Sequence, residues 1–431
     1  MPLESRIDDK TARIGILGLG YVGLPLAMEF CRKGFTVSGF DVSAARVGSL
    51  RRGRSYILDV ADEEISHFSQ ENLFEAWDGF EKLSVCDALI ICVQTPLRKT
   101  KEPDLTNVIA ACEQVAKRLM KGQLVVLEST TFPGATEEVV LPVLEKGRKR
   151  LGRDFFLAFS PERVDPGNQT YGISNTPKVV GGAEPKSTKL ACKLYSQIVT
   201  EVVPVASARA AEMVKLLENS FRAVNIALIN EMAQVCHRLG LDIWEIVGAA
   251  ATKPFGYMPF YPGPGIGGHC IPKDPQLLIW KMKTLNFEPR FLQLASTING
   301  GMPVYTVDRI ASVLNEDSKA LKGSRLLVLG VAYKSNTSDY RESPALDVIQ
   351  LLLERGAKVS YHDPFVPQAV LGSRKLSSVA LTDKALAAAD CVIILTVHRD
   401  IDYARTVRRA RRVFDARNAT RGMAKKGLSR L

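Results

Sequence analysis

The sequence has few of the features that mark membrane, secreted, disordered or zinc-stabilised proteins. No run approaches the roughly 18 consecutive apolar residues of a membrane-spanning helix, and the N-terminus, MPLESRIDDK, has no apolar signal core. The eight cysteines form no CxxC pair and no tight Cys/His cluster, which argues against a disulfide framework or a structural zinc site. Hydrophobic residues at 46% and charged residues at 24% exclude a disordered or collagen-like chain. We expect a cytoplasmic globular protein of two or three domains that binds no metal and does not insert into a membrane.

The net charge of +11 is concentrated at the C-terminal end. Residues 399–431 contain 11 Lys and Arg against 3 Asp and Glu, so this segment carries +8 of the total. Its basic run, RTVRRARR, has no interleaved aromatic residues that could stack on bases, so we do not expect nucleic-acid binding. We interpret the segment as a solvated basic face or a frayed tail, with attraction to an anionic ligand or surface as the alternative.

Two parts of the sequence alternate apolar strands with helices, which is typical of α/β domains with a buried parallel sheet. In the first part the predicted strands are ARIGILGLG, FTVSGFD, DALIICVQTP, QLVVLESTTFPG and FFLAFSPERVDPG. In the second part they are SRLLVLGVAYK, AKVSYHDP, DCVIILTVH and RRVFDARN. Between the two parts, residues 207–240 contain no internal Gly or Pro and have apolar residues at helical spacing, which predicts one long helix. We therefore predict two Rossmann-like doubly wound domains, residues 1–205 and 318–431, joined by a long central helix and a helical middle domain, residues 206–317.

The first strand runs into a glycine turn that fits a dinucleotide. Gly18, Gly20 and Gly23 form GxGxxG between a strand and a helix, where glycines allow a pyrophosphate to approach the helix N-terminus. Asp41 ends the next strand, 23 residues after Gly18, and is placed to accept hydrogen bonds from a ribose diol. A carboxylate there repels a 2′-phosphate and favours NAD over NADP, although Arg46 weakens this preference. A glycine turn without a dinucleotide is the alternative.

The second α/β part begins differently, with GVAYK in place of GxGxxG. One glycine leaves less room for a pyrophosphate under a helix, and Lys334 and Arg341 are nearby cations suited to a diphosphate. This pattern favours a different nucleotide in the C-terminal domain, with solvated surface cations as the alternative.

A loop rich in glycine and proline, residues 262–275, surrounds Cys270. Such a loop has little capacity to form a core, so packing does not explain its thiol, whereas most other cysteines lie in apolar runs. A cation such as Lys273 would favour a nucleophilic thiolate at Cys270. We interpret the neighbouring His269 as an incidental loop residue. On the long helix, Lys215 and Asn219 share one face, and Arg222 follows at helical spacing.

Over nearly its whole length the sequence resembles the nucleotide-sugar 6-dehydrogenases of the UDP-glucose/GDP-mannose dehydrogenase family. The motifs that carry the resemblance occur in the family's order: GLGYVGLP, QTP, ESTTFPG, SPERVDPG, EMVKLLENSFRAVNIALINE, PGPGIGGHCIPKDP, AYKSNTSDYRESPALDV and DARN.

The resemblance implies a polysaccharide-biosynthesis enzyme that oxidises the C6 alcohol of a UDP-sugar to the acid with two NAD+. NAD would lie on the N-terminal domain and UDP on the C-terminal one, with the central helix forming a homodimer or a dimer of dimers. Cys270 matches the nucleophile that forms a thiohemiacetal and then a thioester. The other matching catalytic positions are Lys215, Asn219, Asp274, Glu162 and Thr130. The matching cofactor positions are Gly18, Gly20, Tyr21, Val22, Gly23, Asp41, Arg46, Thr95, Thr130 and Arg341. The matching substrate positions are Arg163, Val164, Lys215, Asn219, Arg222, Lys253, Gly265, Tyr333 and Lys334.

The segment ATKPFGYMPFYPGPG, which leads into the cysteine loop and is called the loop leader below, resembles the branch that oxidises UDP-N-acetylglucosamine. Ala250 and Lys253 replace the His and Arg typical of the UDP-N-acetylmannosamine branch, and GIGGHC replaces the GFGGSC of UDP-glucose enzymes. UDP-N-acetylglucosamine is therefore the predicted substrate, with other 2-acetamido sugars, UDP-N-acetylmannosamine or UDP-glucose as alternatives. A catalytically silent nucleotide-binding regulator is the alternative that is not an enzyme.

Overall fold

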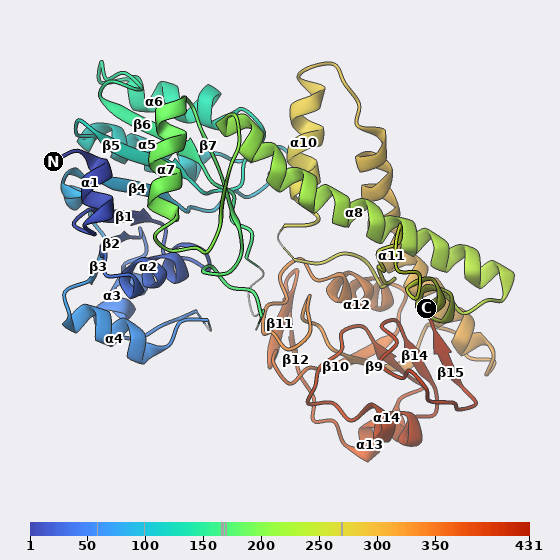
Figure 1. Cartoon of the computed structure of the whole chain (residues 1–431). Helices are drawn as coiled ribbons and strands as arrows, with labels where there is room; N and C mark the ends of the chain where they lie inside the picture. The colour runs from blue at the N-terminus through green and yellow to red at the C-terminus, as the bar shows by residue number, and fades with distance from the viewer. Residues whose placement is uncertain (58, 99, 165–167, 169, 269) are drawn as a thin grey trace. The chain divides into compact units, whose positions relative to one another are not determined.

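The computed structural model describes the whole chain except residues 58, 99, 165–167, 169 and 269. It contains two compact units, one of residues 1–218 with 276–287 and one of residues 219–275 with 288–431 (Figure 1). Among the described residues, no helix combines the length and the apolar character needed to cross a membrane.

The described strands of the first unit form one eight-stranded sheet with the order β3-β2-β1-β4-β5-β6-β7-β8. All neighbours in it are parallel except β6 and β7, which are antiparallel. The strands are β1 (Arg13–Leu17), β2 (Thr36–Phe40), β3 (Phe74–Trp77), β4 (Ala88–Ile91), β5 (Gln123–Leu127), β6 (Phe155–Phe159), β7 (Lys178–Gly182) and β8 (Val202–Pro204). Every residue of β4, β5 and β6 is buried, which explains their nearly continuous apolar sequences.

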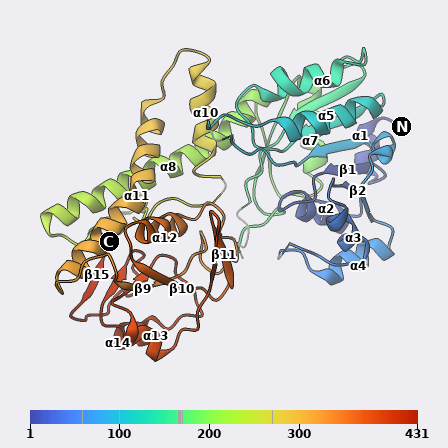
Figure 2. The ribbon, with the colours of Figure 1, turned by 180° about the vertical axis from the view of Figure 1, so that it is seen from behind.

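Helices cover both faces of this sheet, as Figures 1 and 2 show. One apolar core lies under α1 (Leu3–Asp8), α2 (Gly23–Arg32), α3 (Ala44–Arg51), α4 (Asp62–Gln70) and α7 (Pro185–Tyr195). A second core lies on the other face under α5 (Thr106–Arg118), α6 (Leu141–Glu145) and the start of α8 (Ala208–Leu239). The short turns η1 (Glu81–Val85) and η2 (Thr136–Val140) complete that layer.

The second unit contains a parallel five-stranded sheet with the order β10-β9-β13-β14-β15 and a separate hairpin, β11-β12. Its strands are β9 (Arg325–Leu329), β10 (Lys358–His362), β11 (Gln368–Leu371), β12 (Arg374–Ser377), β13 (Cys391–Ile394), β14 (Val413–Asp415) and β15 (Leu428–Arg430). One face packs on α11 (Arg290–Asn315) and α12 (Pro344–Glu354), and the other on α13 (Asp383–Ala388) and α14 (Tyr403–Arg409). The remaining helices are α9 (Ile243–Ala250) and α10 (Asp274–Lys283).

These elements confirm the predicted fold class of two doubly wound α/β domains, each with a mainly parallel sheet, and a helical segment between them in the chain. The predicted long helix is α8, which begins at Ala208 and ends at Leu239.

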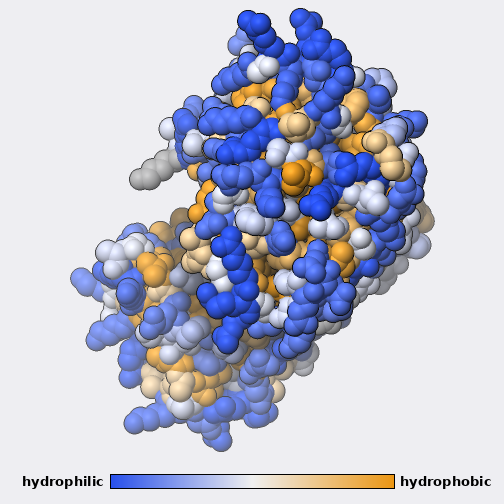
Figure 3. Space-filling view, turned by 90° about the vertical axis from the view of Figure 1, so that its left-hand side faces the viewer, coloured by the Kyte–Doolittle hydropathy of each residue, from blue (hydrophilic) through white to orange (hydrophobic). Residues whose placement is uncertain are grey.

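One interpretation is wrong: the basic C-terminal segment is not a frayed tail. It forms α14, β14 and β15, and Leu431 is buried. Two hydrogen bonds join the Arg412 guanidinium to the Asp317 carboxylate, so part of the basic charge is paired. The face seen in Figure 3 is mostly hydrophilic, with hydrophobic residues in small separate groups.

Candidate active site

The glycine turn of the first unit has the close packing that a dinucleotide-binding turn needs. Gly18 has φ of +95°, and a Cβ on Gly23 would lie 1.9 Å from the Gly18 carbonyl oxygen. A Cβ on Gly20 would meet nothing within 4 Å, so the backbone there is open to an approaching group. The turn leads directly into α2, for which Val22 is the N-cap, and Tyr21 is exposed. This arrangement fits a pyrophosphate held by backbone N–H groups at a helix N-terminus.

The Asp41 carboxylate organises the region beside this turn. It is buried at the end of β2 and accepts hydrogen bonds from the backbone N–H of Leu19 (3.0 Å) and Ser43 (2.9 Å). Arg46 lies 3.4 Å from the same carboxylate and stacks over the Tyr56 ring at 5.6 Å. Asp41 and the glycine turn therefore form one preorganised cradle that fits a ribose and a pyrophosphate.

Further polar residues follow the carboxyl ends of neighbouring parallel strands, where α/β sheets bind ligands. Thr95 follows β4, and its hydroxyl donates to the Thr130 carbonyl (2.6 Å), which fixes the loop after β4 to the loop after β5. Glu128 follows β5 and is buried, and Glu162 follows β6. The structure thus brings Thr95 and Thr130 together at the same edge of the sheet as the glycine turn.

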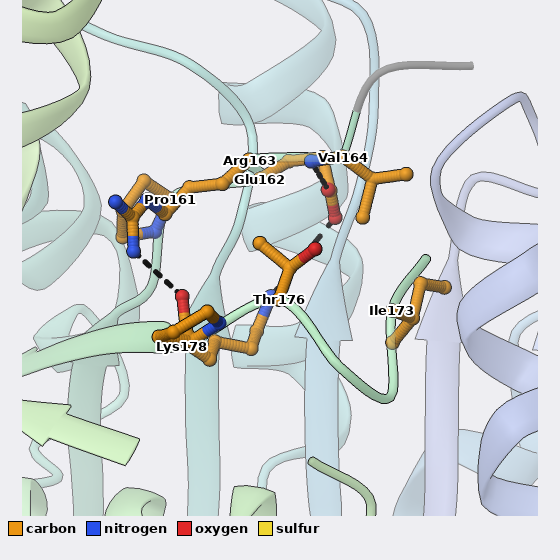
Figure 4. Close-up of a pocket in the computed structure, with 8 residues that line it drawn as sticks. Pro161, Glu162, Arg163, Val164, Ile173, Thr176 and Lys178 are labelled. Carbon is orange, nitrogen blue, oxygen red and sulfur yellow. Dashed lines mark hydrogen bonds and ion pairs between the residues drawn. The ribbon is translucent and has the colours of Figure 1, made fainter. Parts of the chain in front are cut away.

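The segment after β6 forms a small pocket that contains Glu162, Arg163 and Val164 (Figure 4). The Glu162 carboxylate accepts from the Val164 N–H (2.6 Å), and its backbone carbonyl accepts from the Lys215 ammonium. The Arg163 guanidinium donates to the Pro177 carbonyl and to the Glu218 carboxylate, both at 2.6 Å. Lys215 is buried, and this contact fixes its ammonium beside the Glu162 backbone.

In the second unit, the predicted nucleophile lies in an exposed turn. Cys270 is the exposed cysteine of the eight, whereas burial raises the pKa of the Cys112 and Cys391 thiols to about 12. The Cys270 carbonyl accepts from the N–H of Asp274 (2.8 Å), the first residue of α10. The Asp274 side chain is fully buried and accepts from the Asn219 amide (2.5 Å). The structure thus joins Asn219, Asp274 and the cysteine turn, whereas the catalytic role of Asp274 stays a prediction. His269 lies outside the described residues.

The glycines of the cysteine loop allow it to pack closely on the second unit. A Cβ on Gly267 would lie 2.9 Å from the Tyr333 Cβ, and a Cβ on Gly268 would lie 2.8 Å from the Tyr333 ring. Gly265 has φ of +137°, and its Cβ would lie 2.9 Å from Pro344. A side chain at Gly267 or Gly268 would push the loop away from Tyr333, and one at Gly265 would meet Pro344, so the close approach requires glycine.

In the second unit, the carboxylate that follows strand β10 is hydrogen-bonded to other groups of the protein. Asp363 follows β10 and accepts from the N–H of Val331 (2.8 Å) and Ala332 (3.1 Å), and from buried His398 at 3.1 Å. Although burial opposes the charge, these hydrogen bonds lower the pKa of Asp363. The carboxylate is therefore committed to holding the GVAYK turn, in agreement with a nucleotide different from the one on the first sheet.

The remaining predicted substrate and cofactor positions of the second unit lie at its surface. The Arg341 guanidinium is held by two hydrogen bonds to the Asp339 carboxylate (2.9 and 2.7 Å). Arg222 and Lys253 are exposed, with the Lys253 ammonium over the Phe255 ring at 5.1 Å, and Lys334 is half-buried. Their contacts with a cofactor or substrate stay predictions.

Two buried asparagines that were not predicted from the sequence fix the cysteine loop. The Asn230 side chain accepts from the Gly263 N–H (3.0 Å) and donates to Asn299 (2.9 Å), which in turn donates to the Ala223 carbonyl (3.0 Å). Their only signal in the sequence is that amides interrupt two otherwise apolar helix faces. Arg417 of the DARN motif also contacts the loop, because a Cβ on Gly263 would lie 2.4 Å from its guanidinium. Burial lowers the pKa of Arg417 to about 10.

No group of three or more His, Cys, Asp or Glu residues suited to a metal ion occurs among the residues that the structure describes.

Three family models match the chain in the order in which its parts occur. They are the NAD binding domain of the UDP-glucose/GDP-mannose dehydrogenase family at residues 12–199, its central domain at 209–300 and its UDP binding domain at 327–422.

Curated relatives and solved structures are similar to most of the chain. A relative from Pseudomonas aeruginosa, named UDP-N-acetyl-D-glucosamine 6-dehydrogenase, is 39% identical over 359 residues, which are 83% of this chain and 84% of the relative. A solved UDP-D-ManNAc dehydrogenase from Pyrococcus horikoshii superposes with a TM-score of 0.89 at 33% identity, over 97% of this chain and 98% of that one. A solved UDP-glucose dehydrogenase from Pyrobaculum islandicum gives a TM-score of 0.86 at 31% identity, over 97% of each chain. The names of these proteins differ in the sugar.

Proposed function

The chain belongs to the UDP-glucose/GDP-mannose dehydrogenase family, and from this premise we propose that it oxidises the C6 alcohol of a UDP-N-acetylhexosamine to the uronic acid. UDP-N-acetylglucosamine is the first candidate substrate. The observation that carries the proposal is an exposed thiol, Cys270, in a glycine-rich loop that packs on Tyr333, in a chain that also has a dinucleotide cradle.

The residues of the first unit are suited to hold NAD. The turn at residues 18–23 would bind the pyrophosphate, Asp41 would accept from the ribose hydroxyls, and Thr95 and Thr130 would line the strand ends beyond it. When bound, NAD+ supplies the acceptor for a hydride at its nicotinamide ring. We propose three domains with the bounds 1–205, 206–317 and 318–431. NAD would bind to the first domain and UDP to the last.

Residues of the chain itself transfer the protons and form the covalent bond to the carbonyl carbon. Lys215 transfers the proton of the C6 hydroxyl as a hydride leaves that carbon: its amine form takes the proton, and the resulting ammonium donates to the oxygen. Asn219 donates to the same oxygen from the next turn of α8. The Cys270 sulfur then adds to the aldehyde carbon to give a thiohemiacetal, and loss of a second hydride leaves a thioester.

Hydrolysis completes the reaction. Glu162 takes a proton from water as the water oxygen attacks the thioester carbon, and the carbon–sulfur bond breaks to release Cys270. In total, one primary alcohol, one water and two NAD+ give one carboxylate, two NADH and three protons. The step at Glu162 requires an ionised carboxylate that is held still, and the hydrogen bond from the Val164 N–H supports this requirement.

The preference for N-acetylglucosamine is supported by the loop leader and by the relative from Pseudomonas aeruginosa at 39% identity. UDP-N-acetylmannosamine and UDP-glucose remain the competing substrates, because similar proteins carry both names.

A homodimer through α8 is part of the proposal. Phe221, Leu228, Val235 and Leu239 follow helical spacing along α8, and each is more than a third exposed, with values from 39% to 66%. A stripe of apolar residues of this length is typical of a surface that a partner covers, and a second copy of α8 matches it in length and character.

The proposal is tested by measuring NADH release with UDP-GlcNAc, UDP-GalNAc, UDP-ManNAc and UDP-glucose. We expect two NADH per sugar and the highest kcat/KM with UDP-GlcNAc. Equal kcat/KM values for all four would contradict the sugar preference, and no NADH with any would favour a silent nucleotide-binding regulator. A Cys270→Ser variant should stop before the acid is released.

A further inference from the structure

A buried ion-pair network lies directly behind Glu162 and has no part in the chemistry proposed so far. The Lys178 ammonium lies 3.1 Å from one Glu128 carboxylate oxygen and 4.0 Å from a Glu162 carboxylate oxygen. The other Glu128 oxygen accepts from the Tyr195 hydroxyl. The side chains of Lys178 and Glu128 are 7% and 0% exposed, whereas that of Glu162 is 13% exposed and opens to the pocket in Figure 4.

The sheet topology explains why one lysine lies between two carboxylates. Strands β5 and β6 are parallel with Leu127 opposite Phe159, so Glu128 and Glu162 both follow the carboxyl ends of neighbouring strands. Strand β7 runs the other way and pairs Gly181 with Phe159. Continuing this register places Lys178, the first residue of β7, opposite Glu162. The antiparallel strand therefore places a lysine at the edge of the sheet where the parallel strands β5 and β6 place carboxylates.

We propose that Lys178 is a positioning residue for Glu162, which keeps that carboxylate ionised beside the second, buried carboxylate of Glu128. The inference rests on the proposed function, in which Glu162 is the base that activates water. Two carboxylates at one buried site cannot both ionise easily without a cation between them. With Lys178 in place, Glu128 fixes the ammonium from behind, and the ammonium faces Glu162.

Further titratable groups among the described residues around Glu162 enter this balance. From α8, the Lys215 ammonium donates to the Glu162 backbone carbonyl, and Glu218 is paired with Arg163. From the end of α7, Tyr195 donates to Glu128, and burial raises its pKa well above the usual value, so it stays neutral. Cys92 after β4 also stays a thiol, because burial raises its pKa.

The electrostatic environment of Lys178 and Glu128 agrees with this assignment. Burial opposes the charge of Lys178, but the carboxylates of Glu128 and Glu162 outweigh it and raise the pKa of the lysine. Burial also raises the pKa of Glu128, while Lys178 and Tyr195 oppose that rise. The Lys178 ring contact, 4.9 Å above Tyr195, adds a further interaction that favours the cation.

The test compares Lys178→Met, Glu128→Gln, the double variant and Lys178→Arg in the full chain. Lys189→Met is the matched control, because this lysine is an exposed cation of the same unit. Two quantities are measured against pH: kcat for UDP-GlcNAc, and the protonation of Glu162 by carbon NMR of glutamate-labelled protein, with Glu162→Gln used to assign the signal. The NMR readout needs no turnover, so the failure of the proposed function and the failure of this inference are distinguishable.

We expect Lys178→Met and Glu128→Gln to shift the pH profile in opposite directions. Lys178→Met should move the acidic limb of kcat and the protonation of Glu162 to higher pH by about one pH unit, so that kcat falls about tenfold on that limb and changes little at pH values above it. Glu128→Gln should move both to lower pH, the double variant should return near wild type, and Lys178→Arg and Lys189→Met should keep the wild-type profile. If Lys178→Met does not fold, the inference is tested by the shift to lower pH in Glu128→Gln and by the near-wild-type profile of the double variant. A purely structural role predicts lower folded yield with unchanged pH profiles in all variants, and that result would overturn the inference.

Discussion

Glu212 gives the first unit a stability that depends on pH. It lies on α8, is 1% exposed, and accepts from the Gly134 N–H (2.5 Å), the Thr136 N–H (2.8 Å) and the Thr136 hydroxyl (2.6 Å). Burial outweighs these hydrogen bonds and raises the pKa of Glu212 from 4.5 to about 7. Because the folded pKa is the higher one, its stabilisation is complete below about pH 4.5 and is lost as the pH rises through about 7.

The size of this effect follows from the two pKa values. The interval from 4.5 to about 7, at about 1.4 kcal/mol per pKa unit, corresponds to about 3 kcal/mol of unfolding free energy. For a unit of this size that is about 6 to 12 °C in Tm. A Glu212→Gln variant cannot titrate at this position, so its Tm should fall less than the wild-type Tm between pH 5 and pH 8.

The assay is thermal unfolding of both proteins at half-unit pH steps, followed by circular dichroism. Glu113→Gln is the matched control, because Glu113 lies on α5 of the same unit in an exposed pair with Lys146. We expect its curve to run parallel to that of the wild type. If the Glu212→Gln curve also runs parallel to wild type from pH 5 to pH 8, the assignment of the pH dependence to this carboxyl is wrong.

Three further predictions concern the cofactor cradle, the cysteine loop and the dimer. Asp41→Ala should raise KM for NAD+ about tenfold, because a buried charged acceptor is lost; an unchanged KM contradicts the cradle. Asn230→Ala removes the hydrogen-bond partner of the Gly263 N–H and of the Asn299 side-chain oxygen, and should lower the unfolding free energy by about 2 kcal/mol in urea titrations. An unchanged midpoint would contradict its anchoring role. Leu228→Glu should yield monomers by light scattering, and a dimer that survives this change does not use α8.

The regular elements and the glycine turn were predictable because their signals are local. Continuous apolar runs marked the parallel strands, and a stretch without Gly or Pro marked α8. The glycine turn and Asp41 were visible because strict spacing and backbone geometry require those residue types at those places.

The network behind Glu162 could not be predicted, because its signal is not local. Lys178 is one of 57 Lys and Arg residues, and its burial depends on the antiparallel register of β7 with β6. Asn230 and Asn299 are likewise ordinary polar residues of two helices until the fold brings them together under Gly263. The carboxylate partners of Arg163 and Arg341 could not be predicted either, because packing decides which carboxylate lies beside each arginine.

The most direct test of the mechanism is the intact mass of the protein, quenched in acid during turnover with UDP-GlcNAc and NAD+. The account predicts a population heavier by one oxidised UDP-sugar bound as a thioester, with the added mass on the peptide that contains Cys270. Steady release of two NADH per sugar with no covalent adduct, or with the adduct on another cysteine, would contradict it.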